Sequence, residues 1–224
     1  HQIVVTFKNG LAKHYIDGNL TASNDLNFNS INVTDGNFST IGRGIGQPGV
    51  WGARFYEGNI DEIIIFDRSL IESDLTLLLS GVEYPDDISG HYKFNSGSGD
   101  ILFDHSGNQK HGVISGATWS DDVYVPPIPP AIGGNNSLIF DGENDYVEID
   151  EGIFNLYYGE GDDCNYTISS KIKINDLEKE GIILGNGDNS TGLYIKVTSE
   201  GKINLHIGEE NFYSSDLLIK ENTW

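Results

Sequence analysis

The segment Ile60-Asp61-Glu62-Ile63-Ile64-Ile65-Phe66, followed at once by Asp67-Arg68-Ser69-Leu70-Ile71-Glu72, is the part of the chain that decides its fold. Its first half is a short apolar run rich in β-branched residues, which predicts a strand buried in a sheet. Its second half has capping-box spacing, with Ser69 at the N-cap and Glu72 three residues later. We therefore expect one short helix, because Gly81 follows as a stop after the helically spaced Leu70, Ile71, Leu75, Leu78 and Leu79.

Most of the remaining chain is typical of short strands separated by Gly, Asn, Asp and Ser. Turn signals recur about every 8–12 residues, the spacing of an all-β sandwich. Asp17-Gly18 predicts a hairpin tip and Thr198–Lys202 a second turn. The expected fold class is an all-β antiparallel sandwich with one short helix. Its further strands are predicted at Ile3–Phe7, Ala12–Ile16, Phe38–Gly42, Gly90–Phe94, His111–Ser115, Ser137–Phe140, Tyr146–Ile149, Tyr166–Ile174, Gly181–Gly185, Gly192–Thr198, Ile203–Ile207 and Asn211–Ser214.

The composition suits a folded acidic domain of 224 residues, with 38% hydrophobic residues and a net charge of −21. That charge argues against nucleic acid or an anionic membrane surface as a partner, because both would repel it. We expect no membrane insertion, since no stretch approaches the roughly 18–20 apolar residues of a span. The single cysteine, Cys164, allows no disulfide framework within the chain. An extracellular or cell-surface location fits the acidic surface.

The two ends of the sequence read as one uninterrupted element when joined. Glu221-Asn222-Thr223-Trp224 followed by His1-Gln2-Ile3-Val4-Val5-Thr6-Phe7-Lys8-Asn9-Gly10 gives a Trp, an alternating apolar run and a turn. This pattern predicts a strand and turn that cross the break. We therefore expect the break to cut through a domain.

Two sets of motifs resemble a known family, the laminin G-like, concanavalin A-like jelly rolls. Residues 90–224 resemble its first half, through Gly90-His91-Tyr92-Lys93-Phe94, Asp104-His105-Ser106-Gly107-Asn108-Gln109-Lys110-His111-Gly112 and Leu138–Ile149. Residues 1–81 resemble its second half, through Tyr15-Ile16-Asp17-Gly18 and Phe55–Leu70. The resemblance implies a jelly roll whose halves stand in permuted order, joined by a linker at 82–89.

Three origins fit this permuted order. The chain is one repeat of a tandem array, a permutant that folds alone, or a unit that exchanges halves with neighbouring copies of itself. A half sandwich leaves open strand edges and a bare apolar face. Either the chain's own other half or a half from a neighbouring copy must therefore complete each sandwich.

The loop around Asp104 is the candidate metal site. Asp104, Ser106 and Asn108 form an oxygen-rich loop, and calcium prefers about six to eight oxygen ligands in such loops. The resemblance implies a structural calcium ion held by Asp104, Asn108, His111 and Asp61, with His111 binding through its carbonyl. The alternative is that Asp104 and Asn108 only hydrogen-bond to their own loop as Asx turns.

A catalytic role for Asp61 and Glu62 is not expected. Jelly-roll glycosidases place two carboxylates about 5 Å apart on one face of a strand when they retain configuration. Adjacent strand residues point to opposite faces, so Asp61 and Glu62 should not form such a pair.

Glycans provide two further kinds of candidate site. Asn-x-Ser/Thr sequons, which accept glycans in a glycosylating compartment, occur at Asn19, Asn32, Asn37, Asn135, Asn165 and Asn189. Rings can stack on sugars, and the candidate rings are Trp51, Tyr56, Tyr157, Tyr158 and Tyr213, although core and rim packing explains them as well.

These observations favour a non-catalytic structural or adhesive repeat of a cell-surface filament or adhesin. The alternative is a carbohydrate-binding module of a larger secreted enzyme or lectin. A glycoside hydrolase is the weakest of the three interpretations.

Overall fold

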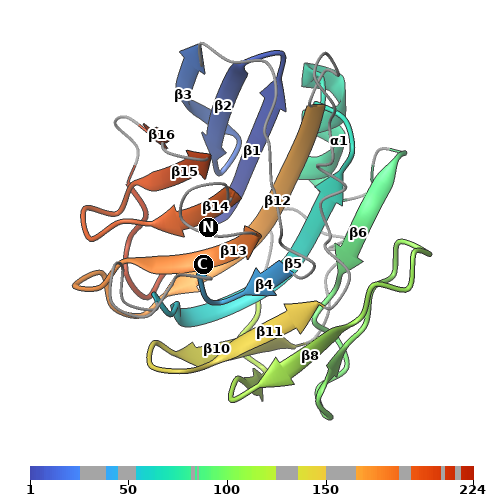
Figure 1. Cartoon of the computed structure of the whole chain (residues 1–224), viewed down its shortest axis with the longest axis vertical. Coiled ribbons are helices and arrows are strands. Elements are labelled where there is room, and N and C mark those ends of the chain that lie inside the picture. Colours follow the sequence, from blue (N-terminus) through green and yellow to red (C-terminus); the bar gives the residue numbers. More distant parts are fainter. Residues whose placement is uncertain are drawn as a thin grey trace.

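The computed structural model describes residues 1–25, 39–44, 54–81, 84, 86–124, 136–149, 165–186, 193–207, 210–214 and 218–224. The predicted fold class is confirmed, because two antiparallel sheets lie face to face with one helix beside them (Figure 1). No helix in these ranges is long and apolar enough to cross a membrane.

The first sheet, sheet A, has a seven-strand path with an eighth strand beside it. Along the path lie β3 (Asn19–Asp25), β2 (Leu11–Ile16), β1 (Gln2–Lys8), β12 (Asn165–Ile174), β5 (Glu57–Phe66), β10 (Ser137–Asp141) and β9 (Thr118–Ser120), and β6 (Ile88–Tyr92) pairs with the far half of β5. The long β5 lies at the centre, since it pairs with β12 on one edge and with β10 and β6 on the other.

The second sheet, sheet B, has eight strands. Their order is β16 (Glu210–Tyr213), β15 (Ile203–Ile207), β14 (Leu193–Val197), β13 (Gly181–Asn186), β4 (Ser39–Ile41), β11 (Tyr146–Ile149), β8 (Gly112–Ser115) and β7 (Ile101–Leu102). Every predicted strand overlaps one of the observed strands, whereas β3, β7 and β9 were not among the predicted strands.

The two segments that resemble family halves are interleaved in both sheets. In sheet A, β1 and β5 of the first segment pair with β12 of the second. In sheet B, β4 lies between β11 and β13. The strands of both segments thus pair within one chain, and an exchange with neighbouring copies remains a prediction.

Two apolar layers hold this arrangement together. Between the sheets, alternate residues of β1 such as Ile3, Val5 and Phe7 join the main core, and Phe7 stacks on Tyr166 with ring centroids 5.4 Å apart. On the outer face of sheet A, Val4 packs in a second cluster that includes Leu75 of the helix α1 (Glu72–Ser80). Burial on both faces explains why β1 and β5 read as continuous apolar runs.

The start of α1 differs from the prediction. Ile71, rather than Ser69, is the N-cap, and Asp74 accepts a hydrogen bond from the Ile71 backbone N–H at 3.3 Å. Arg68 holds the same carboxylate at 2.5 Å, so this ion pair helps to set the first turn two residues later than expected. The predicted stop is confirmed, since Gly81 is left-handed with a φ of 64°.

The hairpins of sheet A follow from their turn residues. Asp17 and Gly18 both have positive φ, 49° and 78°, as a type I′ turn requires. This confirms the predicted hairpin tip and places β3 at the edge of the sheet.

Candidate functional site

The Asp104 loop is closed by its own hydrogen bonds. One carboxylate oxygen, Oδ1, accepts the backbone N–H groups of His91 at 3.0 Å and Ser106 at 2.9 Å. The other, Oδ2, accepts the Ser106 hydroxyl at 2.8 Å and the Lys110 N–H at 3.1 Å. Burial raises the pKa of Asp104, but these hydrogen bonds outweigh it and hold the pKa below its usual value.

The side chains of Asn108 and His111 make other contacts of the loop. The side-chain amide of Asn108 donates to the Ser89 carbonyl at 3.0 Å, which ties the loop to β6. His111 Nδ1 accepts the backbone N–H of Asp104 at 3.1 Å. The bond from the Ser106 N–H to Asp104 matches the Asx-turn alternative, whereas Asn108 bonds outside its own loop.

Asp61 makes no described contact with this loop. Its side chain lies in β5, fully buried, where Oδ1 accepts the Glu62 N–H at 2.8 Å and Oδ2 accepts the Tyr124 N–H at 3.3 Å. Burial raises its pKa to about 7, outweighing the backbone hydrogen bonds and Lys171.

Of the four predicted calcium ligands, Asp104 is already occupied by hydrogen bonds from the chain and Asp61 makes no described contact with the loop. A carboxylate offers about four lone-pair positions, and four donors already use those of Asp104. Across the described ranges, no group of three or more His, Cys, Asp or Glu side chains is placed to hold a metal. The calcium ion that the resemblance implies is a question for experiment.

A buried polar network lies beside this loop, and the sequence analysis missed it. The carboxylate of Glu62 pairs with the ammonium group of Lys171 through Oε2. Its Oε1 accepts the Tyr84 hydroxyl and lies 3.2 Å from His91 Nε2. The side chains of Glu62, His91 and Lys171 are only 5%, 6% and 7% exposed. Burial raises the pKa of Glu62, but the hydrogen bond to His91 and the charge of Lys171 outweigh it and lower the pKa.

A β-bulge brings the two acids of β5 to the same lysine. Lys171 pairs with Asp61 and its neighbour Ser170 with Ile63, so Glu62 is the extra residue without an opposite partner. The alternation that we predicted is wrong at this point, because Ile60 and Ile63, three residues apart, both join the main core. The argument that Asp61 and Glu62 point to opposite faces of the strand therefore does not hold here. The enclosure of both carboxyl groups is the stronger observation against catalysis.

The ends of the chain meet on β12. The His1 amino group donates to the Ile172 carbonyl at 2.6 Å, and the Ile172 N–H donates back to His1 at 2.7 Å. Two residues further along the strand, Ile174 accepts the Asn222 N–H at 2.8 Å. Lys220 donates its backbone N–H to His1 Nε2 at 3.2 Å, and both ends lie together in Figure 1. Residues 220–222 and β1 thus lie one after the other along the same edge of β12.

Comparison with known proteins places the first segment in a family. Residues 1–76 match the family model Laminin_G_3, described as the concanavalin A-like lectin/glucanases superfamily. The predicted resemblance is confirmed over β1 to β5, which include Asp61 and Glu62. Searches among curated proteins and among solved structures found no match. Domains of the concanavalin A-like superfamily are typically extracellular.

The candidate rings for sugar stacking lie in different environments. Tyr56 is fully buried and packs edge-on against Phe140 with ring centroids 6.2 Å apart, as the core-packing interpretation expects. Tyr213 on β16 is 47% exposed. Trp51, Tyr157 and Tyr158 lie outside the described residues.

Two of the predicted sequons fall within the described residues. Asn19 is exposed at the start of β3, where its side chain donates to the Asp17 carbonyl at 3.1 Å. Asn165 is half-buried at the start of β12. Asn32, Asn37, Asn135 and Asn189 lie outside the described part of the chain, and use of any sequon remains a prediction.

Proposed function

We propose that this concanavalin A-like domain is a non-catalytic structural or adhesive repeat of an extracellular or cell-surface protein. The observation that carries the proposal is the succession of His1 and Asn222 along β12. A peptide bond between Trp224 and His1 would place the end of one copy and β1 of the next on a single β12. Copies joined in series would then exchange halves, so that 1–81 of one copy completes 90–224 of its neighbour.

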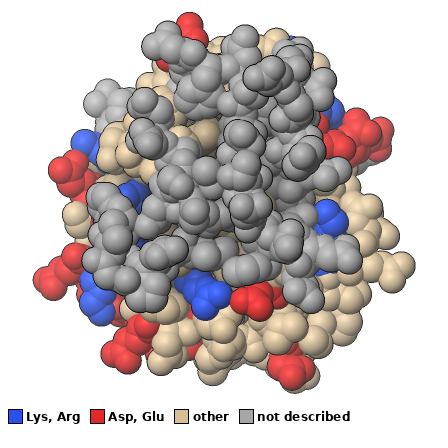
Figure 2. Space-filling view, viewed as in Figure 1, with Lys and Arg blue, Asp and Glu red and all other residues tan. Residues whose placement is uncertain are grey.

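The acids of β5 support a non-catalytic role. A glycosidase needs two carboxyl groups that reach the sugar and its attacking water. Asp61 is fully buried, and both oxygens of Glu62 have partners. The acidic surface suits a solvated extracellular protein, because Asp and Glu side chains stand out around the face drawn in Figure 2.

The proposal is tested with a permuted chain in which 90–224 is joined directly to 1–81. If the ends are neighbours on β12, this chain folds as a monomer and is at least as stable to urea as the parent. Its matched control carries three glycines at the 224/1 junction. A direct junction that is clearly less stable than the glycine-spaced one would contradict the proposal, because the ends would then need added length. Sedimentation of a chain made of two parent copies, joined from Trp224 of the first to His1 of the second, tests whether the copies exchange their halves.

The second candidate is a carbohydrate-binding module. It is favoured by the family description, which includes lectins, and by the exposed ring of Tyr213. A glycan array with calcium present tests it, with Tyr213→Ala as the variant and Tyr213→Phe as its control. Binding that the alanine variant alone loses would support this candidate, and an array without any signal would exclude it for the glycans displayed.

A further inference from the structure

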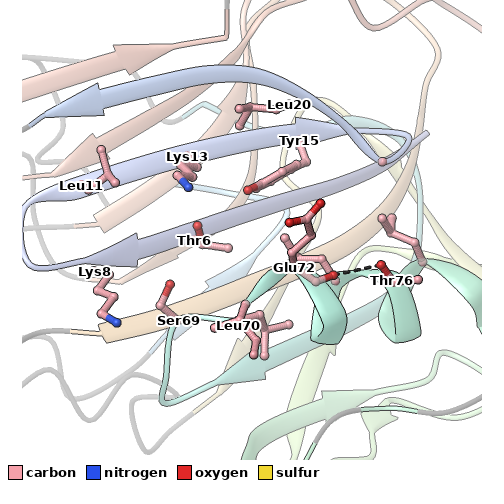
Figure 3. A pocket seen from close by; sticks show the side chains of 14 residues that line it. Thr6, Lys8, Leu11, Lys13, Tyr15, Leu20, Ser69, Leu70, Glu72 and Thr76 are labelled. Atoms are coloured by element: carbon pink, nitrogen blue, oxygen red, sulfur yellow. Dashed lines mark hydrogen bonds between the residues drawn. The ribbon is translucent and has the colours of Figure 1, made fainter.

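A groove runs along the helix on the outer side of sheet A. Its volume is about 650 Å³, within the range of sites for small ligands, about 300–1,000 Å³. Strands β1 and β2 and the beginning of β3 form one wall, and Ser69 to Leu79 form the other. Leu79 closes one end, since a Cβ added at Gly18 would lie 3.2 Å from its side chain. We call this hollow the α1 groove (Figure 3).

One end of the α1 groove is cationic. Figure 3 shows Lys8 and Lys13 at this end, with the hydroxyl groups of Thr6 and Ser69 between them. Within the described ranges neither ammonium group pairs with a carboxylate. By contrast, all three arginines form ion pairs. Two unpaired ammonium groups beside two hydroxyl groups form a set of donors that suits a carboxylate or sulfonate.

The remainder of the groove offers apolar surface to solvent. Leu20 is 54% exposed and Ile71 is 62% exposed, and both line it. Leu79 of α1, which is half-buried, extends this surface, and the buried Leu75 also lines the groove. Exposed aliphatic side chains gathered in one concavity commonly mark a binding surface.

We propose that the α1 groove binds a small organic anion with an apolar body, whose acid group lies between Lys8 and Lys13. Its apolar part covers Leu20, Ile71 and Leu79. Glu72 lies away from the lysines, beside Tyr15, and its charge contributes after burial to the raised pKa of Tyr15. That carboxylate repels a second anionic group, so the site selects a ligand with one charged end.

The acidity of the whole chain does not prevent this binding. The Debye length is about 8 Å at physiological ionic strength, so distant carboxylates are largely screened at the mouth of the groove. The two nearby ammonium groups determine the local potential instead. Affinity should therefore fall as salt rises, but only by the amount expected for a two-charge contact.

Calorimetric titration with dodecanoate tests the site. We expect saturable one-to-one binding, which Lys8→Gln with Lys13→Gln weakens by about tenfold or more through loss of two charged contacts. The matched control is Lys93→Gln with Lys220→Gln, two lysines outside the groove without described ion pairs, which should change affinity less than about twofold. Circular dichroism confirms that each variant is folded.

The apolar part is tested separately. Ile71→Ser should weaken dodecanoate binding, whereas Leu77→Ser, an exposed leucine of α1 that does not line the groove, should not. Dodecanol lacks the charge and trigalacturonate lacks the apolar body, so both should bind more weakly than dodecanoate. The proposal is overturned if dodecanoate does not saturate, if the groove and control variants lose affinity equally, or if either comparison ligand binds as tightly.

Discussion

Glu62 and Lys171 form an ion pair across β5 and β12, with side chains only 5% and 7% exposed. The pair exists because a bulge leaves Glu62 without an opposite residue and turns it toward the lysine. Tyr84 and His91 satisfy the other carboxylate oxygen, which a buried ion pair needs to offset its desolvation. Sheet A thus carries a charged network inside its packing.

Removing one partner of this pair should be strongly destabilising. Glu62→Gln leaves the Lys171 ammonium buried without its counter-ion, at a cost of roughly 3–5 kcal/mol in the free energy of unfolding. Urea denaturation measures this change. Replacing both partners, Glu62→Leu with Lys171→Met, should restore much of the loss because no buried charge remains. A Glu62→Gln variant as stable as the parent would show that the Glu62–Lys171 pair is not buried in solution.

Asp61 should make stability fall as the solution becomes less acidic. Its pKa is raised to about 7 in the folded protein, from an unfolded value of 3.8. Between these values the folded state binds more protons than the unfolded state, so the unfolding free energy decreases with rising pH across this window. Asp61→Asn should remove this decrease. Urea midpoints from pH 4 to 8 check it, with the exposed Asp121 changed to Asn as control.

His14 acts in the opposite direction over nearly the same range. It is fully buried on β2, and its ring nitrogens have no hydrogen-bond partner in the described part of the chain. Burial lowers its pKa to about 4 from 6.5, so the unfolded state binds the extra proton and acid weakens the fold below pH 6.5. His14→Leu should flatten this slope and stabilise the protein by about 1 kcal/mol or more, since an unsatisfied polar ring is removed. An unchanged acid slope would contradict the assignment.

The strands could be predicted because their causes are local. Apolar runs and turn residues such as Asp17-Gly18 determine where strands begin and end. The missed strands are of two kinds: β3 is polar and largely exposed, whereas β7 and β9 have only 2 and 3 residues. Such segments become strands through their neighbours, which no local pattern reveals.

The candidate sites were harder to predict because their contacts join distant parts of the chain. The sequence next to Glu62 carries no glycine or proline that would mark a bulge, and only its register against Lys171 creates the bulge. Likewise, the N–H group of His91 lies 13 positions before Asp104 in the sequence but completes that carboxylate's hydrogen bonds. The resemblance drew attention to Asp104, yet it could not show that three backbone N–H groups and the Ser106 hydroxyl occupy its oxygens.

The Asp104 loop gives the last prediction. Because its carboxylate accepts four hydrogen bonds from the chain, we expect EDTA to leave the melting temperature unchanged. Asp104→Asn should lower the unfolding free energy by about 1–3 kcal/mol with or without calcium, since it removes the charge and two acceptor positions. Scanning calorimetry in calcium and in EDTA measures both effects. A melting temperature that rises with calcium in the parent but not in the variant would instead restore the calcium site, because only a bound ion stabilises the folded state in this concentration-dependent way.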